Sequence, residues 1–303
     1  MANLSVNFCG INFKNPIIPA SGAFGFGREY EKFFPLNLLG GIATKGTTLE
    51  KRDGNPPPRI AETPSGMLNS VGLQNPGISY FLENEMPNLQ TKGTIIISNI
   101  AGSTIEDCVE VARQIENSAV DMIELNISCP NVKTGGVAFG VCSTSAEEIT
   151  KKVKYVTSKP LMVKLSPNVT DITEIAKAVE AGGANAVSLI NTLLGMRIDI
   201  NSRRPILKNN VGGLSGSAVF PVALRMVWQV ANAIKIPVCG MGGVTSTTDA
   251  IEMLLAGASL IQVGAANFSD PYAMIKIIDG INNYLDENNI TNLTDIIGQV
   301  KPW

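Results

Sequence analysis

The stretch TIIISNIAGSTIEDCVEVARQIENSAVDMIELNIS, residues 94–128, predicts two strands with an amphipathic helix between them. Residues 94–100 form a largely apolar run, which is typical of a strand buried on both faces of a parallel sheet. Ser103 and Glu106 have the spacing of a capping box and predict the start of the helix over 103–118. A strand, a helix and a second strand in this order indicate a right-handed parallel crossover.

The same alternation continues outward from this stretch in both directions. Besides 94–100 and 122–128, strands are predicted at residues 16–21, 40–46, 161–166, 185–191, 236–242 and 259–265. Further helices are predicted at residues 145–158, 171–183, 218–234, 245–258 and 270–288. Strands and helices in this alternation predict an α/β fold, a (β/α)₈ TIM barrel that forms a single domain over residues 1–303. A doubly wound open sheet is the competing topology.

Three segments lie outside this alternation. Residues 4–16 predict an N-terminal hairpin that turns at Cys9-Gly10 and closes the bottom of the barrel. Residues 47–78 and 192–217 are long connections that each follow a strand. Structureless loops of this length are usually lids or binding loops, so we expect both over the C-terminal, catalytic face of the barrel.

Composition excludes several classes of protein. The chain is 45% hydrophobic with a net charge of −2, and its basic residues are scattered, which argues against a nucleic-acid binder. It has no apolar run of the roughly 18–20 residues that a membrane span needs. The N-terminal sequence MANLSVNFCG lacks the features of a signal peptide. We therefore expect a cytoplasmic protein.

Histidine is absent, which removes the commonest general base and the commonest metal ligand. The five cysteines include no C-x-x-C pair, so neither a disulfide framework nor a metal or iron–sulfur site is expected on this chain. We interpret four of them as structural: Cys9, Cys108, Cys142 and Cys239.

Glycines follow the last two predicted strands. Gly242-Gly243 comes after the seventh and Gly264-Ala265 after the eighth, where backbone N–H groups can approach a phosphate. Phosphate sites recur at this place in TIM barrels. Gly216 could add a third contact. The competing interpretation is that these glycines serve tight turns only.

Polar residues end several other strands. Lys45 and Lys164 each follow apolar strand residues, and a buried lysine needs an anionic partner, so the pair predicts an anion site. Asn99, Asn126 and Asn191-Thr192 supply amide and hydroxyl groups for a planar ligand. Cys129, in NISCPN (126–131), is either a catalytic residue on a loop or a buried structural cysteine. Residues 69–77 are either part of the site or an ordinary turn.

The chain resembles the dihydroorotate dehydrogenase family along essentially its whole length. The matching motifs are PASGAFG (19–25), TKG (44–46), NSVGLQNPG (69–77), SNI (98–100), NISCPN (126–131), VKLSPN (163–168), NT (191–192), GGLSG (212–216), GMGGV (240–244) and VGAA (263–266). The cysteine in NISCPN is typical of class 1. The segment NVKTGGVAFG (131–140) resembles class 1B, the NAD-linked class that works with a separate electron-transfer subunit.

The resemblance implies a role for each matching residue. It implies oxidation of dihydroorotate to orotate in pyrimidine biosynthesis, with hydride passing to FMN and with Cys129 as the base. The implied substrate-binding residues are Lys45, Asn69, Ser70, Val71, Gly72, Leu73, Asn126, Asn191 and Thr192. The implied FMN-binding residues are Ser21, Lys45, Gly46, Asn99, Asn126, Lys164, Ile190, Gly216, Gly242, Gly243, Gly264 and Ala265.

The resemblance also implies an assembly. FAD and a 2Fe-2S cluster would lie on a partner subunit, within a heterotetramer built on a homodimer of this chain. The sequence departs from the family at Ala265, where threonine is frequent, and at Val141–Thr144. The alternatives are a class 1A, fumarate-dependent dihydroorotate dehydrogenase, a dihydropyrimidine dehydrogenase-like flavoenzyme, a non-redox phosphate-binding barrel and a non-catalytic flavin-binding scaffold.

Overall fold

The computed structural model describes residues 2–128 and 139–303, and a sheet of eight parallel strands forms its centre. In sheet order the strands are β3 (Ile17–Pro19), β16 (Ala258–Val263), β15 (Val238–Met241), β10 (Ala186–Leu189), β9 (Leu161–Lys164), β8 (Met122–Asn126), β7 (Ile95–Ile100) and β4 (Gly41–Ala43). The edge strands β3 and β4 contact each other, and the Gly40 N–H donates to the Ile17 carbonyl at 2.9 Å. The sheet therefore forms a nearly closed barrel, which confirms the predicted TIM barrel and excludes the open sheet.

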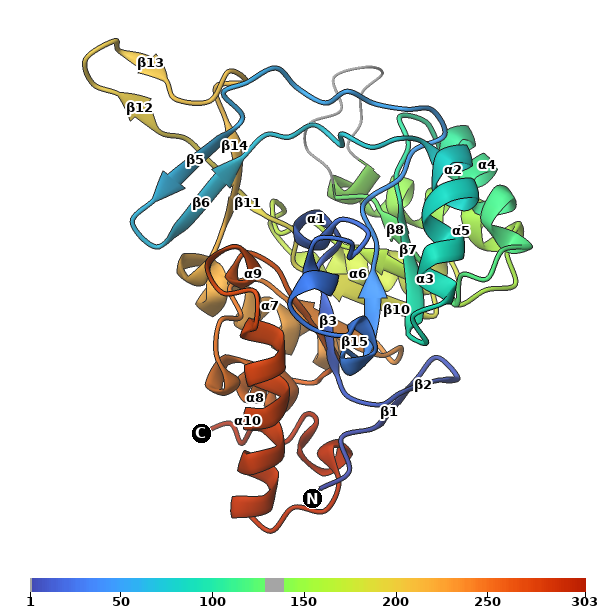
Figure 1. The fold of residues 1–303 in the computed structure, drawn as a ribbon, viewed down its shortest axis with the longest axis vertical. Coiled ribbons are helices and arrows are strands. Elements are labelled where there is room, and N and C mark those ends of the chain that lie inside the picture. Colours follow the sequence, from blue (N-terminus) through green and yellow to red (C-terminus); the bar gives the residue numbers. More distant parts are fainter. Residues whose placement is uncertain (1, 129–138) are drawn as a thin grey trace.

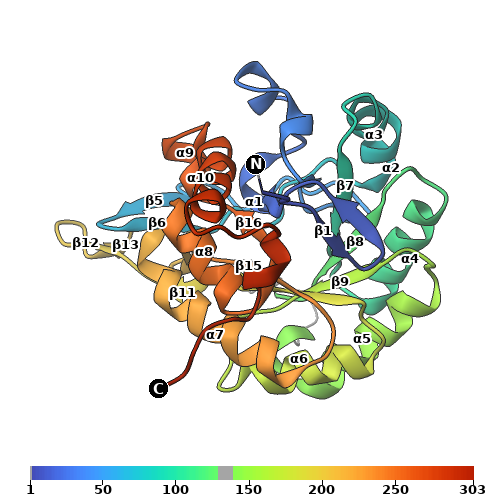
Figure 2. The ribbon, with the colours of Figure 1, turned by 90° about the horizontal axis from the view of Figure 1, so that it is seen from below.

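Helices surround the barrel on the outside (Figure 2). The six predicted ones are α4 (Ile105–Glu116), α5 (Ser143–Tyr155), α6 (Ile172–Ala181), α7 (Phe220–Ala233), α8 (Thr247–Leu255) and α10 (Ala273–Glu287). Shorter helical segments are α1 (Ser21–Phe24), η1 (Tyr30–Lys32), η2 (Leu36–Leu38), α2 (Ile78–Tyr80), η3 (Phe81–Glu85), α3 (Met86–Gln90), η4 (Phe139–Val141), η5 (Ser217–Val219), α9 (Ala266–Ser269) and η6 (Leu293–Ile296).

The cap of α4 differs from the prediction by one residue. Thr104, and not Ser103, is the N-cap: its hydroxyl oxygen accepts from the Asp107 N–H at 3.0 Å. The Asp107 carboxylate in turn accepts from the Thr104 N–H at 3.1 Å. Ser103 with Glu106 and Thr104 with Asp107 share the same spacing, so the sequence pattern alone does not separate them.

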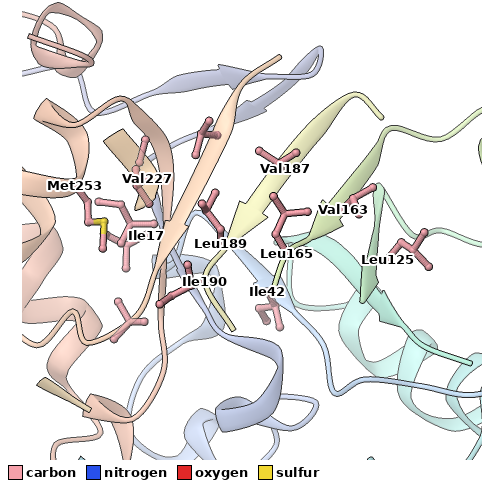
Figure 3. Packing of buried hydrophobic residues seen from close by; sticks show 14 of the residues in the cluster. Ile17, Ile42, Leu125, Val163, Leu165, Val187, Leu189, Ile190, Val227 and Met253 are labelled. Carbon is pink, nitrogen blue, oxygen red and sulfur yellow. The ribbon is translucent and has the colours of Figure 1, made fainter. Parts of the chain in front are cut away.

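Side chains alternate along each barrel strand between the interior and the helix layer. On β8, Ile123 and Leu125 pack outward into the main hydrophobic core, while Met122 belongs to a separate cluster inside the barrel. Figure 3 shows part of the outer core, to which both Val163 of β9 and Val227 of α7 belong. Successive side chains of a β-strand point to opposite faces. In this barrel the alternation separates the outer core, against the helices, from the apolar cluster inside the barrel.

The N-terminal hairpin closes the bottom of the barrel, as predicted. It consists of β1 (Val6–Phe8) and β2 (Ile11–Phe13), and the turn residues Cys9 and Gly10 have φ values of 54° and 83°. Phe8 and Phe13 meet edge to face with ring centroids 6.2 Å apart, and both are fully buried in the interior apolar cluster. Both chain termini lie at this end of the molecule (Figure 1).

The two long connections lie over the C-terminal face of the barrel, as predicted, and they contain short strands. They pair with each other in an antiparallel sheet of β11 (Leu193–Gly195), β14 (Gly212–Ser215), β6 (Gly66–Asn69) and β5 (Ile60–Thr63), and the second also forms β12 (Ile198–Asp199) and β13 (Arg204–Pro205). This small sheet lies at the end of the barrel opposite the termini (Figure 1). Its central pairing joins residues far apart in sequence, which local patterns do not reveal.

Among residues 2–128 and 139–303, no helix has the length and apolar character needed to cross a membrane.

We expect Phe13→Ala to destabilise the chain by about 3–5 kcal/mol, because it removes a fully buried ring and leaves a cavity under the barrel. Urea unfolding measures the change. Phe33→Ala is the matched control, since the Phe33 side chain is 46% exposed, and it should cost less than about 1 kcal/mol. Equal losses in the two variants would contradict a plug role for the hairpin.

Candidate active site

A cavity of about 300 Å³ lies between the C-terminal ends of the barrel strands and the small antiparallel sheet. Eighteen of the residues predicted for the site line it: Ser21, Lys45, Gly46, Asn69, Val71, Gly72, Leu73, Asn99, Asn126, Lys164, Ile190, Asn191, Thr192, Gly216, Gly242, Gly243, Gly264 and Ala265. The structure thus brings together residues from positions 21 to 265. Cys129 lies outside the described residues, and Ser70 does not line the cavity.

Ser70 is buried behind the cavity wall. Its N–H donates to the Arg59 carbonyl at 2.8 Å, and its own carbonyl accepts from the Asn55 amide at 2.8 Å. Neighbouring Val71, Gly72 and Leu73 do reach the cavity. These backbone bonds help to hold the loop in place. The Ser70 hydroxyl oxygen is buried without a hydrogen-bond partner among the described residues, and its contact with a ligand stays a prediction.

Two lysines carry the positive charge of the cavity. Lys164 is only 5% exposed, and Lys45 is half-buried. Within the described parts of the chain, neither ammonium group forms a hydrogen bond or an ion pair. Burial lowers the pKa of Lys45, and repulsion from Arg59 lowers it further. Two cations without anionic partners make the cavity suited to an anionic ligand.

The ends of β8 and β10 are linked by a chain of hydrogen bonds through Ser128. The Asn191 amide donates to the Ser128 hydroxyl at 2.7 Å, and this hydroxyl donates to Oδ1 of Asn126 at 2.6 Å. The Ser128 N–H also donates to the same Asn126 oxygen at 3.1 Å. With its oxygen engaged, Asn126 has its NH₂ group left to offer to a ligand. The sequence analysis did not single out Ser128, although it lies within the NISCPN motif.

The loop over residues 69–77 is organised by Asn75, which is buried. Oδ1 of Asn75 accepts from the Thr48 N–H at 3.1 Å and from the Gly77 N–H at 2.9 Å. Its NH₂ group donates to the Leu73 carbonyl at 2.7 Å. These bonds tie the loop to the end of β4 and hold Gly72 and Leu73 at the cavity wall, so it is more than an ordinary turn.

Glycines without room for a side chain form one end of the cavity. Gly243 has a φ of 75°, and a Cβ atom there would lie 2.7 Å from the Phe220 nitrogen and 2.9 Å from the Gly216 oxygen. Gly216 itself has a φ of 104°. The next strand ends beside them, because Met241 of β15 pairs with Gln262 of β16. Backbone can therefore approach a ligand closely here, as a phosphate site requires.

The sequence analysis missed other residues of the cavity wall. Apolar ones come from the small sheet and its surroundings, including Ile60, Met67 and Leu214, and Phe268 follows β16. Gln262, in the middle of the SLIQVGA strand, also lines the cavity. The alternation of side chains along a strand could have revealed it, because Gln262 lies two residues before Gly264 and therefore faces the same side of the strand.

The described cysteines differ in reactivity. Burial raises the pKa of Cys9 to about 11 and that of Cys108 to about 12, and burial also raises the pKa of Cys239 far above its usual value. These three thiols are therefore inert at neutral pH. Cys142 is exposed, and hydrogen bonds from Ser145 and Thr144 lower its pKa. It does not line the cavity. Within the described residues no cluster of metal-ligating side chains is found.

Comparisons with known proteins agree with this geometry. The model of the family "Dihydroorotate dehydrogenase" matches residues 3–285. A protein of Bacteroides thetaiotaomicron named "Dihydroorotate dehydrogenase B (NAD(+)), catalytic subunit" is 57% identical over 302 residues, which are 99% of this chain and 100% of that protein. Proteins with the same name from Brachyspira hyodysenteriae and Alkaliphilus oremlandii are 57% and 56% identical, each over 98% of this chain and 99% of their own length.

We expect Lys45→Met to raise the melting temperature of the ligand-free chain, because it removes a poorly solvated charge. The pKa of Lys45 is lower in the folded than in the unfolded chain, so its charging penalty is fully present below the folded pKa. The penalty is lost as pH rises through that pKa toward the usual lysine value. The gain should therefore shrink at alkaline pH. Lys32→Met, at an exposed lysine, is the control, and an equal gain there would refute the interpretation.

Proposed function

We propose that this chain, which belongs to the dihydroorotate dehydrogenase family, oxidises dihydroorotate to orotate in pyrimidine biosynthesis. The relatives' names supply the reaction. The observation on this chain that carries the proposal is the meeting of Lys45 and Lys164, without anionic partners in the described structure, with strand-end amides in one cavity. Such a cavity suits a planar, carboxylated ring together with a phosphate-bearing cofactor.

FMN is the cofactor that we propose, and two features of the cavity fit it. The backbone around Gly216 and Gly243 carries no side chain and has no room for one, so its N–H groups can approach a phosphate group closely. The buried oxygens of Asn99 and Gln262 lack hydrogen-bond partners in the described structure, as expected where a ring ligand supplies them. Bound FMN would accept the hydride of the substrate at N5. The residues that would hold it are Ser21, Lys45, Gly46, Asn99, Asn126, Lys164, Ile190, Gly216, Gly242, Gly243, Gly264 and Ala265.

The substrate would lie nearer the small sheet. Lys45 would bind the carboxylate, and the amides of Asn69, Asn126 and Asn191 would bind the ring and its substituents, with Thr192 beside them. Asn168 supports this wall: its NH₂ group donates to the Thr192 carbonyl at 3.0 Å, and its oxygen accepts from the Leu194 N–H at 2.9 Å. Val71, Gly72 and Leu73 would contact the ring from the loop, and Ser70 is proposed to bind the substrate beside them.

Cys129 is the base that we propose for the C5 proton of dihydroorotate. The chain has no histidine, and Cys129 directly follows Ser128, whose hydroxyl joins Asn126 and Asn191 at the cavity. A thiolate is the nearest substitute for an imidazole near neutral pH. The Lys45 ammonium would favour the thiolate and the negative charge that develops on the substrate.

A partner subunit would complete the electron path to NAD. The chain has no G-x-G-x-x-G segment between a strand and a helix, so it lacks a dinucleotide site of that type. The relatives are named as catalytic subunits of an NAD enzyme. We propose FAD and a 2Fe-2S cluster on the partner, in a heterotetramer around a homodimer of this single-domain chain. Its cytoplasmic location stays a prediction.

We expect Cys129→Ser to slow reduction of the bound flavin by dihydroorotate by about 10²-fold or more at neutral pH, because serine is a much weaker base. Anaerobic stopped-flow absorbance measures the rate. Cys142→Ser is the matched control, since Cys142 is exposed and away from the cavity, and it should reduce at the wild-type rate. Unchanged reduction in Cys129→Ser would overturn the assignment of the base.

The electron acceptor is tested on the enzyme purified from its native source. We expect a second subunit with FAD and iron to copurify, and NAD to oxidise the reduced complex. A homo-oligomer without a partner that passes electrons to fumarate would instead support the class 1A alternative.

A further inference from the structure

A carboxylate lies inside the barrel, between the apolar bottom and the cavity. Glu124 of β8 is fully buried and forms no ion pair within the described structure. It accepts three hydrogen bonds from three other strands. The donors are the Asn99 amide of β7 at 2.5 Å, the Gln262 amide of β16 at 2.6 Å and the Ser188 hydroxyl of β10 at 2.7 Å.

The Glu124 carboxylate determines the orientation of the Asn99 and Gln262 side-chain amides. Both carboxylate oxygens of Glu124 accept hydrogen bonds in this arrangement, and Asn99 and Gln262 turn their NH₂ groups toward it. Their oxygens then face away from it, and both are buried without a partner among the described residues. Oδ1 of Asn99 lies toward Gly46, where a Cβ atom would come within 2.8 Å of it.

Two of the three donors belong to the cavity, and one does not. Asn99 and Gln262 line it, together with Gly46, whereas Ser188 does not. The unpartnered oxygens therefore belong to two residues of the cavity wall, which Lys164 also lines. A buried acceptor without a donor destabilises the ligand-free chain, and a ligand that brings an N–H group removes this penalty.

We propose that Glu124 is a positioning residue that turns the Asn99 and Gln262 oxygens toward the ring N–H of the flavin, and that Gln262 is a further flavin-binding residue. The inference rests on the proposed function. The oxidised flavin ring has a single N–H group, at N3, between two carbonyl groups. The amide oxygens accept from this N–H, while Lys164 and the Asn126 NH₂ group suit the flanking carbonyls.

Glu124→Gln tests the positioning role with a minimal change of shape. The substituted side chain presents one NH₂ group where the carboxylate has an oxygen, so one of the two amides must flip or lose its bond. We expect the FMN dissociation constant of the FMN-free chain to rise about tenfold or more, as measured by quenching of flavin fluorescence. Ser188→Ala removes a bond to the same carboxylate but no group of the cavity, so it should change the constant by less than about twofold.

A flavin methylated at N3 separates recognition of the N–H from general damage. This analogue has no N–H to donate, so Glu124→Gln should weaken its binding by less than about twofold. Equal weakening of FMN and the methylated flavin would overturn the inference, as would unchanged FMN binding. Gln262→Met should give the same pattern, and it tests the contact if Glu124→Gln does not fold. Failure of the wild-type chain to bind FMN would instead refute the proposed function itself.

Discussion

The period of two along eight short strands is the constraint on which the rest of the structure depends. Each strand buries one set of side chains against the helices and turns the other set into the barrel. On β8 the inward side chains are Met122 at the apolar bottom, the carboxylate of Glu124 in the middle and the amide of Asn126 at the top. A shift of one residue would exchange the inner and outer sets, so register and site are specified together.

The buried polar groups inside the barrel lower the stability of the fold, and the apolar layers below and around them offset this loss. Lys45 and Lys164 have no anionic partner, Glu124 has no ion pair, and the amide oxygens above it have no donor within the described residues. The two lysines and the two amide oxygens destabilise the ligand-free fold, and each is complementary to a feature of a flavin or of a carboxylated ring, whereas Glu124 acts through the amides that it orients. The N-terminal hairpin and the helix layer hold the side chains inside the barrel in fixed positions. A ligand therefore meets groups that are already oriented before it binds.

Patterns over a few neighbouring residues in the sequence predicted the features that depend only on those neighbours. The eight strands, the six long helices and the N-terminal hairpin follow from periodicity and turn residues, and the glycines and lysines at strand ends followed from their position. The small sheet was missed because β6 and β14 pair across more than 140 residues. Ser70 does not line the cavity, and its predicted contact with the substrate stays a prediction. Glu124 was read only as part of an apolar strand, and Cys129 stays a prediction.

We propose that one cavity of this chain holds FMN and lets dihydroorotate reduce it. Anaerobic titration of the purified, FMN-loaded chain with dihydroorotate tests this directly through the flavin absorbance. We expect the flavin to bleach in proportion to the substrate added, without any partner subunit or NAD. A flavin that is bound but stays oxidised, or a chain that cannot be reconstituted with FMN, would contradict it.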